Sequence, residues 1–179
     1  LDIEFILTKK NKFIILQVRP ILINNLVLSS KYLKKLYDKL AKKIKKLQVS
    51  NPSLIGNTTY FGVMPDWNPA EIIGKKPKPL ALSLYKELIT DHVWSLQRKD
   101  SGFHDVSSSH LLTNFFGTPY VDLRVDFNSW VPKNLDYNTS KKLVNYYLKS
   151  FKNNPDFHDK VEFKIIFTCW TFNTKNKLK

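Results

Sequence analysis

The sequence of 179 residues has one cysteine, one methionine and five glycines, and these shortages exclude several classes of structure. Cys169 alone supports neither an internal disulfide nor a cysteine-based zinc cluster, which fits a reducing compartment. No apolar run approaches the ~18 residues of a membrane span, and the N-terminus lacks the basic region of a signal peptide. We therefore expect a cytoplasmic protein without a membrane span.

Arginine is also scarce, although the chain carries a net charge of +14. Arg19, Arg98 and Arg124 are the only arginines, so 26 of the 29 basic residues are lysines (29 − 3). Because recognition of phosphates and bases favours the guanidinium fork, nucleic acid is not the expected partner. A basic RNA-associated protein is a third hypothesis. Lysine does not replace a bidentate arginine, so we expect the arginines where geometry requires them.

The start of the chain indicates a piece of a longer protein. It has no initiator methionine and opens inside an alternating apolar segment, residues 1–7. A chain of this length holds one domain, or one domain and a fragment of another. Hydrophobic residues make up 42%, which is enough for a substantial core.

Hydrophobic periodicity predicts an α+β fold, in which an N-terminal β-hairpin precedes a body of mixed helices and strands. The expected elements are a hairpin over 1–20, helices over 30–48, 80–98 and 139–152, a short helix near 110–116, and strands over 120–127 and 161–172. Residues 49–57 are expected to form a linker. The expected helix caps are Ser29 or Ser30 for the first helix and Asn138 or Thr139 for the last.

The hairpin carries a specific motif, in which Glu4 and Gln17 would lie near each other across the strands. Its two parts, Asp2-Ile3-Glu4-Phe5 and Leu16-Gln17-Val18-Arg19-Pro20, resemble the closing hairpin of the ATP-grasp domain in phosphoenolpyruvate synthase and pyruvate phosphate dikinase. The resemblance implies that Glu4 binds Mg²⁺, that Gln17 assists the metal or the nucleotide, and that Arg19 contacts phosphate. The implied cofactors are ATP and Mg²⁺.

A second stretch resembles the middle region of large proteins similar to phosphoenolpyruvate synthase. It comprises residues 62–74, with Pro79-Leu80-Ala81, Leu88-Ile89-Thr90-Asp91 and Pro119-Tyr120-Val121-Asp122-Leu123-Arg124. The implied domains are the end of an ATP-grasp domain over 1–24 and the middle domain over 25–179. The implied activity is ATP-dependent phosphoryl transfer between ATP and pyruvate, phosphoenolpyruvate or a related acceptor.

The chain departs from that family at its catalytic parts. None of His92, His104, His110 and His158 lies in the loop that carries the family's phosphohistidine, and five glycines do not build its nucleotide loops. We assign no catalytic residue and expect the isolated chain to be inactive without the ATP-grasp and phosphohistidine domains as partners. The alternative is a non-catalytic module that recognises a sugar, a phosphosugar or a partner domain.

Three dense stretches without simple periodicity supply the remaining candidates. We expect a cleft lined by Asp66, Trp67, Arg98, His104, Asp122 and Arg124. Each group also has a structural interpretation. Asn68, Pro69 and Glu71 fit a helix start with Asn68 as the cap, Trp67 fits the core, and Asp105 beside His104 fits a turn. Asp122, Arg124 and Asp126 are expected on one strand face, as an ion network.

Overall fold

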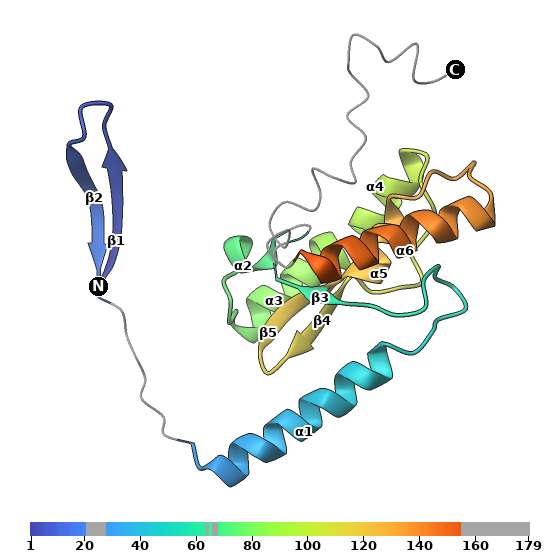
Figure 1. Ribbon diagram of the computed structural model, residues 1–179, viewed down its shortest axis with the longest axis horizontal. Helices are drawn as coiled ribbons and strands as arrows, with labels where there is room; N and C mark the ends of the chain where they lie inside the picture. The colour runs from blue at the N-terminus through green and yellow to red at the C-terminus, as the bar shows by residue number, and fades with distance from the viewer. Residues whose placement is uncertain (21–27, 64, 66–67, 155–179) are drawn as a thin grey trace. The chain divides into compact units, whose positions relative to one another are not determined.

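The computed structural model describes residues 1–20, 28–63, 65 and 68–154, and it divides into two compact units, Leu1–Lys39 and Leu40–Lys179. The second unit is called the body below. Helices occur together with two small antiparallel sheets, so the α+β class expected from the sequence is confirmed (Figure 1). Among the described residues, no helix is both long and apolar enough to cross a membrane.

The first unit begins with the expected hairpin, formed by β1 (Asp2–Leu7) and β2 (Phe13–Arg19). Glu4 lies opposite Gln17, as predicted, and a register shift follows at Glu4/Phe5. Every strand residue is exposed. The apolar side chains of both strands therefore lie uncovered, although a two-stranded hairpin depends on packing for its stability.

Helix α1 (Ser30–Leu47) agrees with the helix expected over 30–48. The Oγ of Ser29 accepts a hydrogen bond from the N–H of Tyr32 at 3.3 Å, so Ser29 caps the first turn. The boundary between the two units falls inside this helix.

The body joins short helices to a three-stranded sheet of order β3-β5-β4. Its elements are β3 (Phe61–Gly62), α2 (Pro69–Ile72), α3 (Pro79–Tyr85), the π-helical segment η1 (Lys86–Thr90), α4 (Val93–Asp100), β4 (Leu112–Phe115), β5 (Thr118–Asp122), α5 (Leu123–Ser129) and α6 (Tyr137–Asn153). Asn68 caps α2 as predicted, because its Oδ1 accepts from the N–H of Glu71 at 3.2 Å, with Pro69 at the first helical position.

Helix α5 lies at the centre of the body, where it packs against α4, α6 and β5 (Figure 1). All seven of its residues are buried. Leu123 and Phe127 belong to one apolar cluster, together with Val144 and Leu148 of α6, while Val125 belongs to a second cluster around Trp94. The helix therefore joins the two halves of the core.

The strand expected over 120–127 is wrong beyond Asp122. The side chain of Asp122 accepts hydrogen bonds from the N–H groups of Arg124 and Val125 and so caps α5. Alternation of apolar and polar residues predicts a strand only if one face meets water, and α5 is buried on every side. Consequently, Asp122, Arg124 and Asp126 do not share a strand face.

Three further expectations require correction. Residues 112–115 form β4 instead of a helix near 110–116, because they pair with β5. The helix expected over 80–98 is divided into α3, η1 and α4, with a turn at residues 91–92. The last helix begins at Tyr137, and its cap is Asp136, not Asn138 or Thr139. The strand expected over 161–172, Cys169, Asp66 and Trp67 lie outside the described residues.

The cap of α6 gives a first prediction. The Oδ1 of Asp136 accepts from the N–H groups of Asn138 and Thr139 at 2.9 and 3.0 Å. We expect Asp136→Ala to lower the free energy of unfolding by about 1 kcal/mol, measured by urea denaturation. Asn138→Ala is the matched control, and we expect it to change stability by less than about 0.5 kcal/mol. An equal loss in both variants would contradict this assignment of the cap.

Candidate functional site

The hairpin places four polar side chains on one face. Asp2 lies opposite Arg19 and Glu4 lies opposite Gln17, and because side chains alternate along a strand, the two pairs share a face. The Nη2 of Arg19 lies 2.8 Å from the Oε1 of Glu4 and 3.1 Å from the Oδ2 of Asp2. These side chains are about half exposed, so the ion pairs contribute little to stability and the groups are accessible to a ligand.

This face has the oxygen donors that Mg²⁺ prefers. Two carboxylates and a carboxamide lie together, and Mg²⁺ is commonly held by one or two carboxylates and the phosphates of a nucleotide. Among the described residues, no three His, Cys, Asp or Glu side chains form a group that could hold a metal ion. Asp2 and Glu4 therefore supply two carboxylates, which is fewer than such a group requires.

In the body, the central polar group is the carboxylate of Asp122, which is 9% exposed. Its Oδ1 accepts hydrogen bonds from the Oγ1 of Thr59 at 2.5 Å and from the N–H groups of Arg124 and Val125 at 3.0 and 3.3 Å. Burial raises the pKa of Asp122 above its ordinary value, and these hydrogen bonds and the charge of Arg124 oppose the rise.

Arg124 is 3% exposed and holds the end of α1. Its Nη2 donates to the carbonyl of Leu47 at 3.2 Å, and its Nη1 donates to the carbonyl of Val49 at 3.0 Å. The last carbonyls of a helix lack partners within the helix and carry the negative end of its dipole. The guanidinium fork of Arg124 bonds the last carbonyl of α1 and a carbonyl beyond the helix at once, which the single ammonium of lysine does less well.

Asn128 fixes the segment that follows α1. Its Oδ1 accepts from the N–H of Ile55, and its Nδ2 donates to the carbonyl of the same residue, both at 2.8 Å. The Nε2 of Gln48 adds a hydrogen bond to the carbonyl of Thr59 at 3.1 Å. Residues 48–59 have no regular secondary structure, as expected of a linker, but side chains of the core hold their backbone in place.

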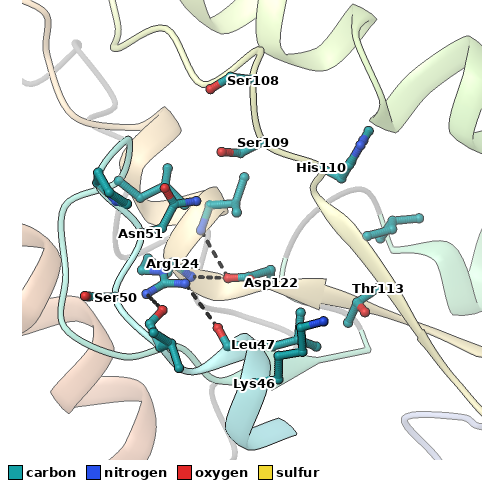
Figure 2. Close-up of a pocket in the computed structure, with 15 residues that line it drawn as sticks. Lys46, Leu47, Ser50, Asn51, Ser108, Ser109, His110, Thr113, Asp122 and Arg124 are labelled. Atoms are coloured by element: carbon teal, nitrogen blue, oxygen red, sulfur yellow. Dashed lines mark hydrogen bonds between the residues drawn. The ribbon is translucent and has the colours of Figure 1, made fainter. Parts of the chain in front are cut away.

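Asp122 and Arg124, with their hydrogen bonds, form the floor of a pocket of about 580 Å³ (Figure 2). In the view of Figure 2, Ser108, Ser109 and His110 lie above Asp122 and Arg124, and Lys46 and Leu47 lie below them. The other lining residues are Val49, Ser50, Asn51, Pro52, Leu54, Leu112, Thr113 and Val125. Three separate segments of the chain therefore surround one buried acid and one buried base.

Only part of the cleft expected from the sequence is assembled in this pocket. Asp122 and Arg124 line it, whereas Arg98 and His104 do not. The guanidinium carbon of Arg98 lies 3.4 Å from the centre of the Trp130 ring. The N–H of His104 donates to the carbonyl of Val131 at 2.9 Å, and burial lowers the pKa of its imidazole. Asp66 and Trp67 are outside the described residues.

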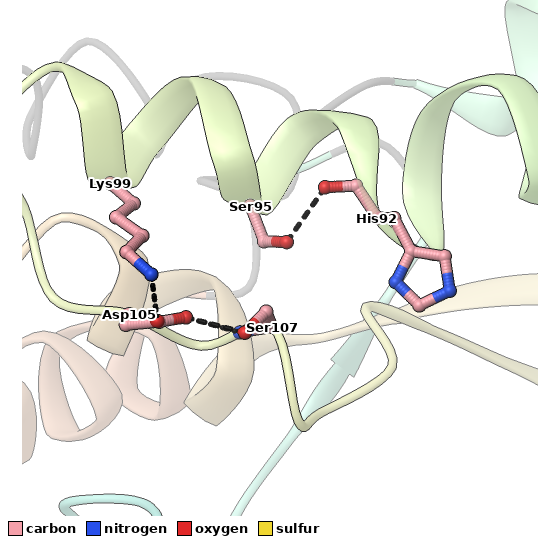
Figure 3. A network of polar contacts seen from close by, with 5 residues as sticks. All are labelled: His92, Ser95, Lys99, Asp105 and Ser107. Carbon is pink, nitrogen blue, oxygen red and sulfur yellow. Dashed lines mark hydrogen bonds and ion pairs between the residues drawn. The ribbon is translucent and has the colours of Figure 1, made fainter.

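The interpretation of Asp105 as a turn residue is confirmed (Figure 3). Its Oδ1 accepts from the N–H and the Oγ of Ser107 at 3.0 and 2.6 Å, and its Oδ2 lies 2.6 Å from the Nζ of Lys99. Hydrogen bonds from Lys99 and Ser107 hold the pKa of Asp105 well below its usual range. The stabilisation that the ionised Asp105 gives to the fold is therefore present at neutral pH, and it is lost as the pH falls below about 4.

The sequence analysis did not single out Lys46, Asn51, Thr59, Ser108 or Asn128. Lys46 resembles seven other lysines of α1, and Thr59 and Asn128 gain partners only through the fold. The run Ser107-Ser108-Ser109-His110 is a local signal that marks one wall of the pocket. Comparisons of the chain with models of protein families, with curated proteins and with solved structures give no match.

The fork at Arg124 gives a second prediction. We expect Arg124→Lys to lower the free energy of unfolding by about 1–2 kcal/mol, because a partly buried carbonyl loses its charged donor. The measurement is chemical denaturation of the full chain. Arg19→Lys is the matched control, since the same change at the exposed hairpin is expected to cost less than about 1 kcal/mol. If both variants were equally stable, the buried fork would have no special role.

The raised pKa of Asp122 gives a third prediction. A folded-state pKa above the unfolded value of about 3.9 means that the folded chain binds more protons between the two values. The contribution of Asp122 to stability therefore falls as the pH rises from about 4. We expect the stability of the wild type, relative to Asp122→Asn, to decrease from pH 4 to pH 7, measured by denaturation at each pH.

Asp136 provides the control, because its pKa is shifted in the direction opposite to that of Asp122. Hydrogen bonds from Thr139 and from backbone N–H groups lower its pKa, so its contribution is present at neutral pH and is lost as the pH falls. The stability of the wild type relative to Asp136→Asn should therefore rise with pH. Slopes of the same sign for the two pairs would show that the environment of Asp122 is misassigned.

Proposed function

We propose that the chain forms part of an ATP-dependent phosphotransferase similar to phosphoenolpyruvate synthase. The hairpin would contribute contacts to magnesium ATP, and the pocket of the body would hold a small molecule. The observation that carries the proposal is the alignment of Asp2, Glu4, Gln17 and Arg19 on one hairpin face. Carboxylates for a metal and an arginine for phosphate are the combination that phosphoryl transfer requires.

Each residue of that face has a proposed role. Glu4 would hold Mg²⁺, with Gln17 assisting, and Arg19 would turn from its two carboxylates to a phosphate oxygen. Mg²⁺ supplies neutralisation of the charge that develops on the transferred phosphate. The described histidines, His92, His104 and His110, are given no phosphate-carrying role, and the isolated chain is proposed to be catalytically inactive.

The pocket of the body favours a second candidate, a non-catalytic module that binds a small ligand. A volume of about 580 Å³ lies within the range of ordinary ligand sites. Its floor is preorganised, because Asp122 and Arg124 are both buried and hydrogen-bonded. Preorganised polar groups lower the cost of ordering a site when a ligand binds.

The nucleotide role gives a fourth prediction. In calorimetric titration of the full chain, magnesium ATP should bind, and Arg19→Ala should weaken binding about tenfold or more, since it removes a charge-assisted contact to phosphate. Glu4→Gln should reduce the magnesium dependence of binding. Lys9→Ala is the matched control, because it removes one positive charge from the hairpin turn, and it should leave the affinity unchanged.

Removal of residues 1–20 separates the two candidates. Loss of nucleotide binding with a folded body would agree with a site on the hairpin. If magnesium ATP bound the truncated chain as tightly as the full chain, the hairpin would not be the nucleotide site. Absence of any heat from a folded full chain would argue against the phosphotransferase role and would favour the binding module.

A further inference from the structure

We propose that the pocket around Asp122 and Arg124 binds a small phosphate monoester that carries hydroxyl groups, and not a nucleotide. This proposal rests on the second candidate function, in which the body is a ligand-binding module. It concerns residues of the body alone and does not depend on the hairpin.

Short polar side chains form part of the wall of the pocket, beside apolar side chains such as Leu54 and Leu112. Hydroxyl and amide groups come from two segments, Ser50 and Asn51 on one side, and Ser108, Ser109 and Thr113 on the other. Hydroxyls both donate and accept hydrogen bonds, so they match the hydroxyl groups of a polyol. Among the described residues that line this pocket, none is Phe, Tyr or Trp, and the imidazole of His110 is the one aromatic ring.

That composition argues against a nucleobase, which proteins commonly bind by stacking on an aromatic ring. The body has aromatic rings elsewhere: a second groove, of about 430 Å³, is lined by Tyr60, Phe61, Phe115, Tyr120 and Phe151. A flat apolar ligand would find its partners there. The pocket around Asp122 instead presents hydroxyl and amide groups, so it suits a compact ligand that carries polar groups.

The charges around the pocket favour an anion. The negative end of α1 points towards the pocket, but the guanidinium of Arg124 donates to its last carbonyl, at Leu47, and to the carbonyl of Val49 beyond the helix. The carboxylate of Asp122 is matched by Arg124 and by three hydrogen bonds. Lys46 then adds a positive charge that has no ion pair with any described residue.

The exposed rim of the pocket has the groups that a phosphate would meet. Lys46, Ser108 and His110 are exposed, in contrast to the buried Asp122 and Arg124. The Nδ1 of His110 lies 3.7 Å from the Oδ1 of Asp91, which orients the imidazole at the edge of the pocket. We therefore place the phosphate at the rim, near Lys46, and the hydroxyl groups of the ligand towards the serines and the floor.

The test uses the full chain and titration calorimetry at fixed ionic strength. The probes are glycerol 3-phosphate and glucose 6-phosphate, compared with glycerol, glucose, inorganic phosphate and AMP. We expect at least one of the two monoesters to bind about tenfold or more tightly than its neutral parent and than inorganic phosphate. AMP should bind no more tightly than inorganic phosphate, because the pocket offers its base no Phe, Tyr or Trp ring on which to stack.

Two neighbouring lysines provide a matched pair of variants. Lys46 lines the pocket, and Lys45, in the same last turn of α1, does not. Both changes to Gln remove one charge and have the same effect on the helix dipole. We expect Lys46→Gln to weaken monoester binding about tenfold and Lys45→Gln to leave it within about twofold. Glu4→Gln in the hairpin should have no effect on this affinity.

The possible failures are distinguishable. If glycerol or glucose bound as tightly as its phosphate ester, the ligand class would be wrong while the binding module would stand. If AMP bound best, the argument from the absence of Phe, Tyr and Trp in the pocket lining would be overturned. Equal losses in Lys45→Gln and Lys46→Gln would reduce the binding to general charge attraction. No binding of any probe to the folded chain would contradict both the ligand class and the binding module.

Discussion

The body depends on the junction at which a buried carboxylate and a buried guanidinium meet the backbone of distant segments. Charges removed from water are costly unless every one is paired and hydrogen-bonded. Asp122 accepts hydrogen bonds from Thr59 and from the first turn of α5, and the two Nη atoms of Arg124 donate to the carbonyls of Leu47 and Val49. The same bonds that satisfy the charges therefore join α1, the loop after it, β5 and α5 into one arrangement.

The scarcity of arginine now has a structural meaning. The two Nη atoms of Arg124 donate to two carbonyls, and the guanidinium of Arg98 lies over the ring of Trp130. Arg19 contacts two carboxylates. A planar fork that stacks and bonds in two directions differs from the point charge of lysine. In a chain whose other basic residues are all lysines, the positions of the arginines were useful guides, and two of the three lie in the buried part of the body.

Features that depend on neighbouring residues were predictable from the sequence. Features that bring distant segments together were not. The register of Glu4 and Gln17, the extent of α1 and the cap at Asn68 depend on neighbouring residues, so the sequence was sufficient for them. Residues 123–127 were wrongly predicted to be a strand, because the alternation of apolar and polar residues implied one face exposed to water, whereas α5 is buried on every side. The pocket joins residues 46–54, 108–113 and 122–125, and nothing in any one segment indicates the other two.

A chain with a net charge of +14 attracts anions in general, and this attraction does not define a site. What distinguishes the pocket is the difference between its floor and its rim. At the floor, Asp122 and the two Nη atoms of Arg124 already have hydrogen-bond partners within the fold, so a ligand gains little by competing for them. The rim holds Lys46, whose charge has no partner among the described residues. Selectivity must therefore come from the charge of Lys46 at the rim together with the hydroxyl and amide groups of the wall. A ligand that binds tightly needs both an anionic group and hydroxyl groups.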